Sequence, residues 1–174
     1  SASNYNTVSG NSMTNNGYGI TLDSASDNTI SGNMFVHDGL WVFNSYGNIV
    51  EDNIINGKPL VYLEDASNQV VAEAGQVILV NCEYIQVQNL NLSHTTVGLQ
   101  LWQTSNTLVS GNSITNNGYG IELFYSSSFN SVSSNSITNN AAGIWLRYSS
   151  NYNTVSGNNI MHNYCGVGFS SSIS

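Results

Sequence analysis

The sequence predicts an all-β protein, a right-handed parallel β-helix of about eight coils, and three observations carry this prediction. A unit of about 22 residues, rich in Asn and Gly, recurs along the chain of 174 residues. Inside the unit, apolar and polar residues alternate with a period of two, which is typical of strands. Asn-Gly steps begin at Asn16, Asn56 and Asn117, and such steps favour tight turns. We expect one domain spanning residues 1–174 that is a piece of a longer or stacked solenoid.

The repeat is clearest in two distant segments. N-T-V-S-G-N-S-M-T-N-N-G-Y-G-I-T-L begins at Asn6, and N-T-L-V-S-G-N-S-I-T-N-N-G-Y-G-I-E-L begins at Asn106. Short strands that return once per coil fit a solenoid in which each coil buries one layer against the next. Residues 64–76 lack the S-G-N motif, and the preceding Gly57-Lys58-Pro59 contains the single proline. The third to fifth coils are therefore predicted to be the least regular.

One position of the repeat is almost always Asn. Stacked Asn side chains can hydrogen-bond from coil to coil, as amide ladders do in other stacked β structures. We therefore assign this column to the stabilisation of turns and not to a ligand site. Its members are Asn11, Asn33, Asn53, Asn112, Asn135 and Asn158.

The composition excludes several partners. Only 7% of the residues are charged, the net charge is -8, and Lys and Arg together number two. A nucleic-acid partner needs a basic stripe, and membrane insertion needs an apolar run of about 18 residues; neither is present. Cys82 and Cys165 are predicted to lie about 19 Å apart, too far for a disulfide.

Catalysis by a β-helix hydrolase needs carboxylates on neighbouring coils as general acid and base. Glu122 and Asp23 each stand alone in their columns when the coils are stacked in order. Asp65 and Glu83 are the only candidate pair, and the two basic side chains lie about four coils apart. We expect no catalytic residues.

The three histidines, His37, His94 and His162, occupy one turn position of the repeat, which is Asn in other coils. Their coils are the second, fifth and eighth, so the strand spacing puts them about 14 Å apart. They are not expected to share one ion, and we predict no metal site and no cofactor.

The outward residues of the main strand are unusually apolar. All three tryptophans fall on this face, where a solvated sheet would carry Thr, Ser, Lys or Glu. An apolar stripe of this size is normally covered. The residues predicted to bind a ligand or partner are Trp41, Phe43, Trp102, Glu122, Phe124, Tyr125, Trp145 and Tyr148.

Three occupants of this face remain open. A glycan could stack on the aromatic side chains, and this fits the zone of Trp102, Glu122, Phe124, Tyr125, Trp145 and Tyr148. A protein interface, such as a homodimer or a neighbouring domain, fits the zone of Val61, Leu63, Ile78 and Val80. A segment of the chain itself could also cover the face.

The units N-T-V-S-G-N…N-N-G-Y-G-I-x-L resemble the repeats of the carbohydrate-binding and sugar-hydrolase superfamily of parallel β-helices. The stretches from Gly57 to Leu60 and from Gly75 to Cys82 are similar to archaeal cell-surface proteins with such repeats. Similar units occur in the periplasmic accessory protein of nitrous-oxide reductase, which is labelled copper-binding. The resemblance implies the fold for the whole chain, but the superfamily has many functions. We do not carry the copper label over, because the histidines are predicted to lie apart.

We therefore predict a non-catalytic extracellular or cell-surface module with a structural or adhesive role, which binds glycans through its aromatic face. The alternatives are a polysaccharide-active hydrolase or lyase, a metal-handling periplasmic accessory protein, and a subunit of a head-to-tail filament. Self-association or end-to-end stacking is a further expectation, whereas nucleic-acid binding and membrane insertion are not expected.

Overall fold

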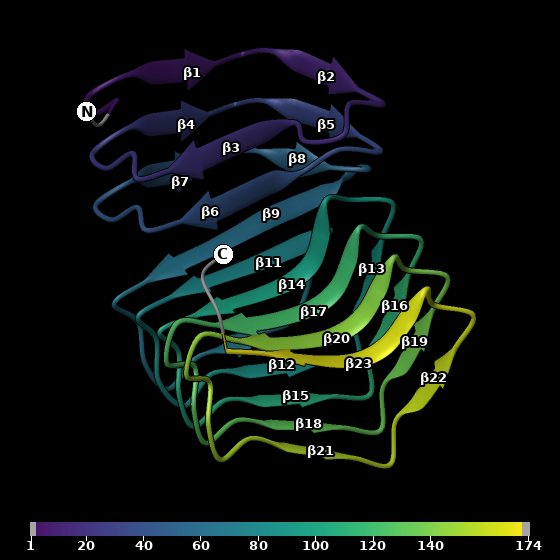
Figure 1. Cartoon of the computed structure of the whole chain (residues 1–174). Helices are drawn as coiled ribbons and strands as arrows, with labels where there is room; N and C mark the ends of the chain where they lie inside the picture. Colours follow the sequence, from purple (N-terminus) through teal and green to yellow (C-terminus); the bar gives the residue numbers. More distant parts are fainter. Residues whose placement is uncertain (1–2, 172–174) are drawn as a thin grey trace.

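The computed structural model describes residues 3–171, which form strands and turns without a helix. Parallel strands stack from coil to coil into a β-solenoid of about seven turns (Figure 1). This arrangement confirms the predicted all-β parallel β-helix. The described residues contain no helix, and therefore no helix that is long and apolar enough to cross a membrane. The predicted domain also includes residues 1–2 and 172–174, which lie outside the described residues.

The first coils form a unit that we call the N-terminal arm, residues 3–57. Each coil contributes short strands because the alternating segments are only a few residues long. One sheet contains β1 (Thr7–Ser9), β4 (Thr29–Ser31) and β7 (Ile49–Glu51). The second contains β2 (Ser12–Thr14), β5 (Met34–Val36) and β8 (Ile54–Ile55), and the third contains β3 (Ile20–Asp23) and β6 (Leu40–Phe43).

The remaining coils form the C-terminal arm, residues 58–171. Its main sheet contains β9 (Lys58–Glu64), β11 (Gln76–Val80), β14 (Val97–Trp102), β17 (Tyr119–Phe124), β20 (Ala142–Arg147) and β23 (Cys165–Ser170). A second sheet contains β10 (Val70–Val71), β12 (Gln86–Gln88), β15 (Leu108–Ser110), β18 (Ser131–Ser133) and β21 (Thr154–Ser156). A third contains β13 (Asn91–Ser93), β16 (Ser113–Thr115), β19 (Ser136–Thr138) and β22 (Asn159–Met161).

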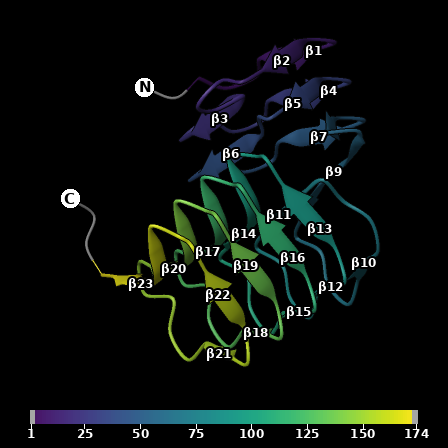
Figure 2. The same cartoon turned by 90° about the vertical axis from the view of Figure 1, so that its right-hand side faces the viewer.

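The chain changes direction between the two arms at Gly57. Strands β8 and β9 pair antiparallel, with Ile55 opposite Lys58, and Gly57 adopts a φ of 82°. The β2-β5-β8 sheet consequently continues into the main sheet of the C-terminal arm. Strand β6 does not pair with β9, and β3 and β6 instead lie above the main sheet in the views of Figures 1 and 2. The prediction of one uninterrupted stack is therefore wrong at this reversal.

After the reversal, the register of β9 differs by one residue from the register that the repeat predicts. Tyr62 pairs with Ile78, and Val61 pairs with Val77. Val61 and Leu63 pack into the interior of the C-terminal arm. The prediction that these two side chains face outward is wrong, and Tyr62 takes the outward position instead.

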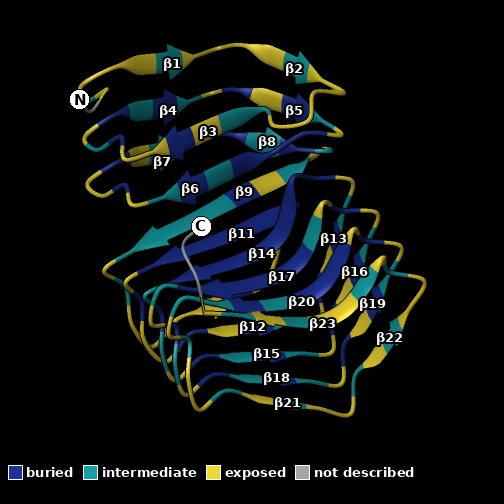
Figure 3. Ribbon diagram, in the orientation of Figure 1, coloured by how far each residue is buried: buried dark blue, intermediate teal, exposed yellow. Residues whose placement is uncertain are grey.

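Apolar side chains form two cores. One fills the interior of the C-terminal arm. The other fills the N-terminal arm and extends into the contact between the arms, joining Leu40 and Val42 of β6 with Ile78, Val80 and Trp102 of the main sheet. Strands β11, β14 and β17 are consequently buried on both faces (Figure 3). The N-terminal arm thus covers much of the face that the sequence left without an occupant.

The predicted Asn ladders are confirmed. Asn33 accepts hydrogen bonds at Oδ1 from the backbone N and the Nδ2 of Asn11, both at 3.0 Å. Asn135 accepts the same pair from Asn112, at 3.0 and 2.9 Å. Where Leu90 takes the Asn position, its backbone N still donates to Asn112 Oδ1, at 2.9 Å. These bonds fix the turn between the two short strands of each coil, such as the turn between β15 and β16.

Candidate functional site

The contact between the arms begins with the backbone of β6, which has an unpaired edge. The Gln76 side chain accepts a hydrogen bond from Leu40 N at 3.0 Å and donates to Leu40 O at 2.7 Å. Gln100 Oε1 accepts one from Val42 N at 3.2 Å. Buried backbone groups need such partners, so two outward glutamine side chains satisfy the edge in place of a neighbouring strand.

Glu122 is fully buried beside these glutamines. Its Oε1 forms an ion pair with Arg147 Nη2 at 2.6 Å. Its Oε2 accepts hydrogen bonds from Trp41 Nε1 at 3.2 Å and from Gln100 Nε2 at 3.0 Å. The carboxylate therefore joins β6 of one arm to β14, β17 and β20 of the other.

Arg147 is held by aromatic rings as well as by this ion pair. Its guanidinium lies 4.9 Å from the centre of the Tyr119 ring and 5.4 Å from that of Trp145. Burial disfavours its charged form, but the Glu122 carboxylate together with Tyr119 and Tyr148 outweighs burial, so the pKa of Arg147 is raised. The positive charge is thus fixed at one place, where the main sheet emerges from under the N-terminal arm.

Burial raises the pKa of Glu122, although Arg147, Gln100 and Trp41 act in the opposite direction. A carboxyl whose pKa is raised by folding stabilises the protein below its unfolded pKa, here 4.5. That contribution is lost as the pH rises through the raised pKa. We expect the free energy of unfolding of the wild type, relative to Glu122→Gln, to fall over this range. Thermal melts of both proteins between about pH 4 and pH 8 measure this difference, and parallel profiles would contradict the assignment.

A groove opens at the margin of the contact between the arms. Its volume is about 170 Å³, and it is lined by Asp23, Trp41, Phe43, Glu122, Phe124, Arg147 and Tyr148. The rings of Trp41 and Phe43 are parallel, with centres 5.8 Å apart. Asp23 is exposed, and the side chain of Arg147 is 20% exposed. The groove therefore combines flat aromatic surface with an exposed acidic residue and a partly exposed basic one, beside the buried Glu122.

The structure gathers most of the predicted site residues here. Those that line the groove are Trp41, Phe43, Glu122, Phe124 and Tyr148. Tyr125 lies beside them, 5.8 Å from Phe43 and 5.5 Å from Tyr148 between ring centres. Trp145 lies beneath Arg147 and is half-buried. Trp102 is fully buried, and its ring centre is 4.5 Å from that of Tyr46.

Two residues of the groove, Asp23 and Arg147, were absent from the predicted site. A continuous stack would place them on coils far apart, and the reversal at Gly57 brings them together. Gln76 and Gln100 also had no predicted role. Two glutamines at outward positions of a largely apolar sheet face were the available signal, because a covered polar side chain needs a hydrogen-bond partner.

The same reversal corrects the prediction for the histidines. The ring centres of His37 and His94 are 5.0 Å apart, with 30° between the planes. The expected separation of about 14 Å assumed a continuous stack and is wrong for this pair. His37 follows β5 of the N-terminal arm, and His94 follows β13 of the C-terminal arm.

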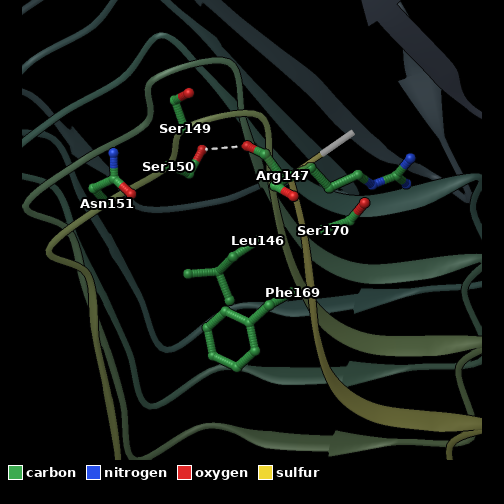
Figure 4. A pocket seen from close by; sticks show the side chains of 8 residues that line it. Leu146, Arg147, Ser149, Ser150, Asn151, Phe169 and Ser170 are labelled. Atoms are coloured by element: carbon green, nitrogen blue, oxygen red, sulfur yellow. Dashed lines mark hydrogen bonds between the residues drawn. The ribbon is translucent and has the colours of Figure 1, made fainter. Parts of the chain in front are cut away.

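A second hollow, of about 370 Å³, lies at the last coil (Figure 4). Leu146 and Phe169 point into it, and Arg147 is turned away from them. Ser150 Oγ donates a hydrogen bond to Arg147 O at 2.8 Å. This hollow is lined by the ends of β20 and β23 and by residues that follow these strands. Among the described residues of its lining, Phe169 has the single aromatic ring. The groove between the arms contains the stacked rings of Trp41 and Phe43 and is the stronger candidate.

Tandem Asn-rich units, Asn ladders and stacked parallel strands define a β-helix repeat protein. The chain belongs to the family described as periplasmic copper-binding protein (NosD), whose sequence model matches residues 1–76 and 67–174. No curated protein matches the chain significantly. Among solved structures, the A-module of the mannuronan C-5 epimerase AlgE6 from Azotobacter vinelandii is similar, with 17% identity and a TM-score of 0.47. The similarity covers 99% of this chain and 57% of that one, so the chain spans little more than half of the module.

Proposed function

We propose that this protein is a non-catalytic β-helix module outside the cytoplasm that binds a neutral glycan in the groove between its arms. One observation carries the proposal: Trp41, Phe43 and Tyr148 form an aromatic wall beside Asp23 and Arg147. The apolar face of a sugar ring stacks on aromatic side chains, and charged groups form strong hydrogen bonds with hydroxyls.

The size of the groove favours contact with one sugar unit at a time. A volume of about 170 Å³ is below the roughly 300–1,000 Å³ usual for sites that enclose a small molecule. A net charge of -8 disfavours polyanionic glycans, because like charges repel at long range. A neutral oligosaccharide that lies across the groove fits both facts.

The state of Glu122 supports binding without catalysis. Asp23 and Glu122 line the same groove, which the sequence did not predict. Both oxygens of Glu122, however, are already engaged by Arg147, Trp41 and Gln100. A general acid or base must reach the proton that it transfers, and this carboxylate is shut off from solvent.

The family supports the location. NosD is described as a periplasmic protein, and a low content of charged residues fits a surface or periplasmic role. A position at the cell surface, an adhesive role and a close relation to archaeal proteins stay predictions.

We expect Tyr148→Ala to weaken oligosaccharide binding by about tenfold, which corresponds to about 1.4 kcal/mol. Tyr148 contributes a half-buried ring to the groove, so its removal takes away stacking surface, while the fully buried side chains that join the arms remain. Isothermal titration calorimetry with a panel of neutral oligosaccharides gives the affinity.

Tyr152→Ala is the matched control, because Tyr152 is 78% exposed and does not line the groove. It should bind like the wild type. Equal loss in both variants, or no binding of any oligosaccharide by the wild type, would reject the proposal.

A further inference from the structure

We propose that His37 and His94 form a two-histidine site for a divalent transition-metal ion, independent of glycan binding. The pair lies across the two arms, with ring centres 5.0 Å apart. Both residues are exposed, so an ion can reach them from solvent. Imidazole nitrogen is a preferred ligand of Cu²⁺, Ni²⁺ and Zn²⁺.

The hydrogen bond of His37 prepares its ring for this role. His37 Nδ1 lies 3.0 Å from Asn15 Oδ1. A carbonyl oxygen can only accept, so Nδ1 carries the proton and Nε2 keeps a free lone pair. Metal-binding histidines usually have such a second partner, which fixes the tautomer and the orientation of the ring.

The surroundings leave room for an ion with water ligands. A hollow of about 240 Å³ contains both histidines, and its other walls are Asn16, Gly17, Thr95, Thr96, Asn116 and Gly118. Among residues 3–171, no group of three His, Cys, Asp or Glu side chains could hold a metal ion. The site is therefore an open one, with two protein nitrogens and the remaining positions filled by water.

His37 and His94 both stand at a turn position whose backbone is left-handed. His37 and His94 have φ values of 56° and 55°, a left-handed conformation that Asn adopts readily. Asn15, Asn116 and Asn139 adopt it at related turns, with φ between 55° and 57°. Asn is thus the ordinary residue of this turn, and replacement of either histidine by Asn should preserve the fold.

Copper tests the proposal directly. Untagged protein is titrated with Cu²⁺ and with Zn²⁺, and the Cu²⁺ complex is examined by electron paramagnetic resonance. We expect hyperfine coupling to two imidazole nitrogens in the wild type and to one in His37→Asn or His94→Asn. Each single variant should lose more than about tenfold in affinity, and Asn15→Ala about tenfold, because a supporting partner tunes its ligand.

His162→Asn is the matched control, since His162 occupies the same kind of turn, with a φ of 56°. It should bind Cu²⁺ like the wild type. Because the ion joins the two arms, it should also raise the melting temperature of the wild type and of His162→Asn, but not of the double variant His37→Asn/His94→Asn. Unchanged affinity in the double variant, or a loss only in His162→Asn, would overturn the proposal.

Discussion

Asn135→Ala is expected to lower the free energy of unfolding by about 3–5 kcal/mol, because it breaks a buried ladder from both sides. Asn135 Oδ1 accepts from the backbone N and the Nδ2 of Asn112, and Asn135 Nδ2 donates to Val109 O at 3.0 Å. All three groups belong to the buried part of the turn. Each buried group left without a partner costs about 1–3 kcal/mol, and alanine replaces none of these bonds. Chemical denaturation gives the value.

Asn159→Ala provides the control for the same change of side chain. Asn159 is an exposed residue of β22 in the neighbouring coil. Surface substitutions usually change stability by no more than about 0.5 kcal/mol. A similarly small effect of Asn135→Ala would mean that the ladders are a consequence of the fold and do not stabilise it.

The ladders were predictable because they depend only on the repeat. Every bond joins a residue to its equivalent one coil away, as Asn112 joins Asn135. The periodicity of the sequence therefore contains the whole pattern. The same local signal predicted the strand positions, the turns and the outward direction of Trp102 and Phe124, which pair in register.

The contact between the arms was not predictable in this way. It depends on the antiparallel pairing of β8 with β9, in which Ile55 lies opposite Lys58. The periodicity of the sequence does not predict this pairing. The irregular sequence around Pro59 indicated where the stack would change, but not that the chain would reverse. Everything that the reversal brings together was consequently misplaced, including Asp23 beside Arg147 and His37 beside His94. The apolar main-strand face was recognised, whereas its occupant was left among three alternatives.

Gln76→Leu is expected to lower the free energy of unfolding by about 3 kcal/mol and to loosen the N-terminal arm. Gln76 is fully buried, and its side chain bonds Leu40 N, Leu40 O and Val97 O. Leucine fills a similar volume but leaves these backbone groups without partners. Because β6 has no strand on this edge, nothing else in the contact can replace the glutamine.

Hydrogen exchange separates this local effect from general destabilisation. The amide of Leu40 should exchange faster in Gln76→Leu, while amides of the Asn ladder at Asn112 and Asn135 keep their protection. Gln86→Leu is the control, because Gln86 is an exposed residue of β12, and it should leave both sets unchanged. Uniform loss of protection in Gln76→Leu would show that the two arms unfold as one unit, and that the groove and the histidine pair share the stability of the whole chain.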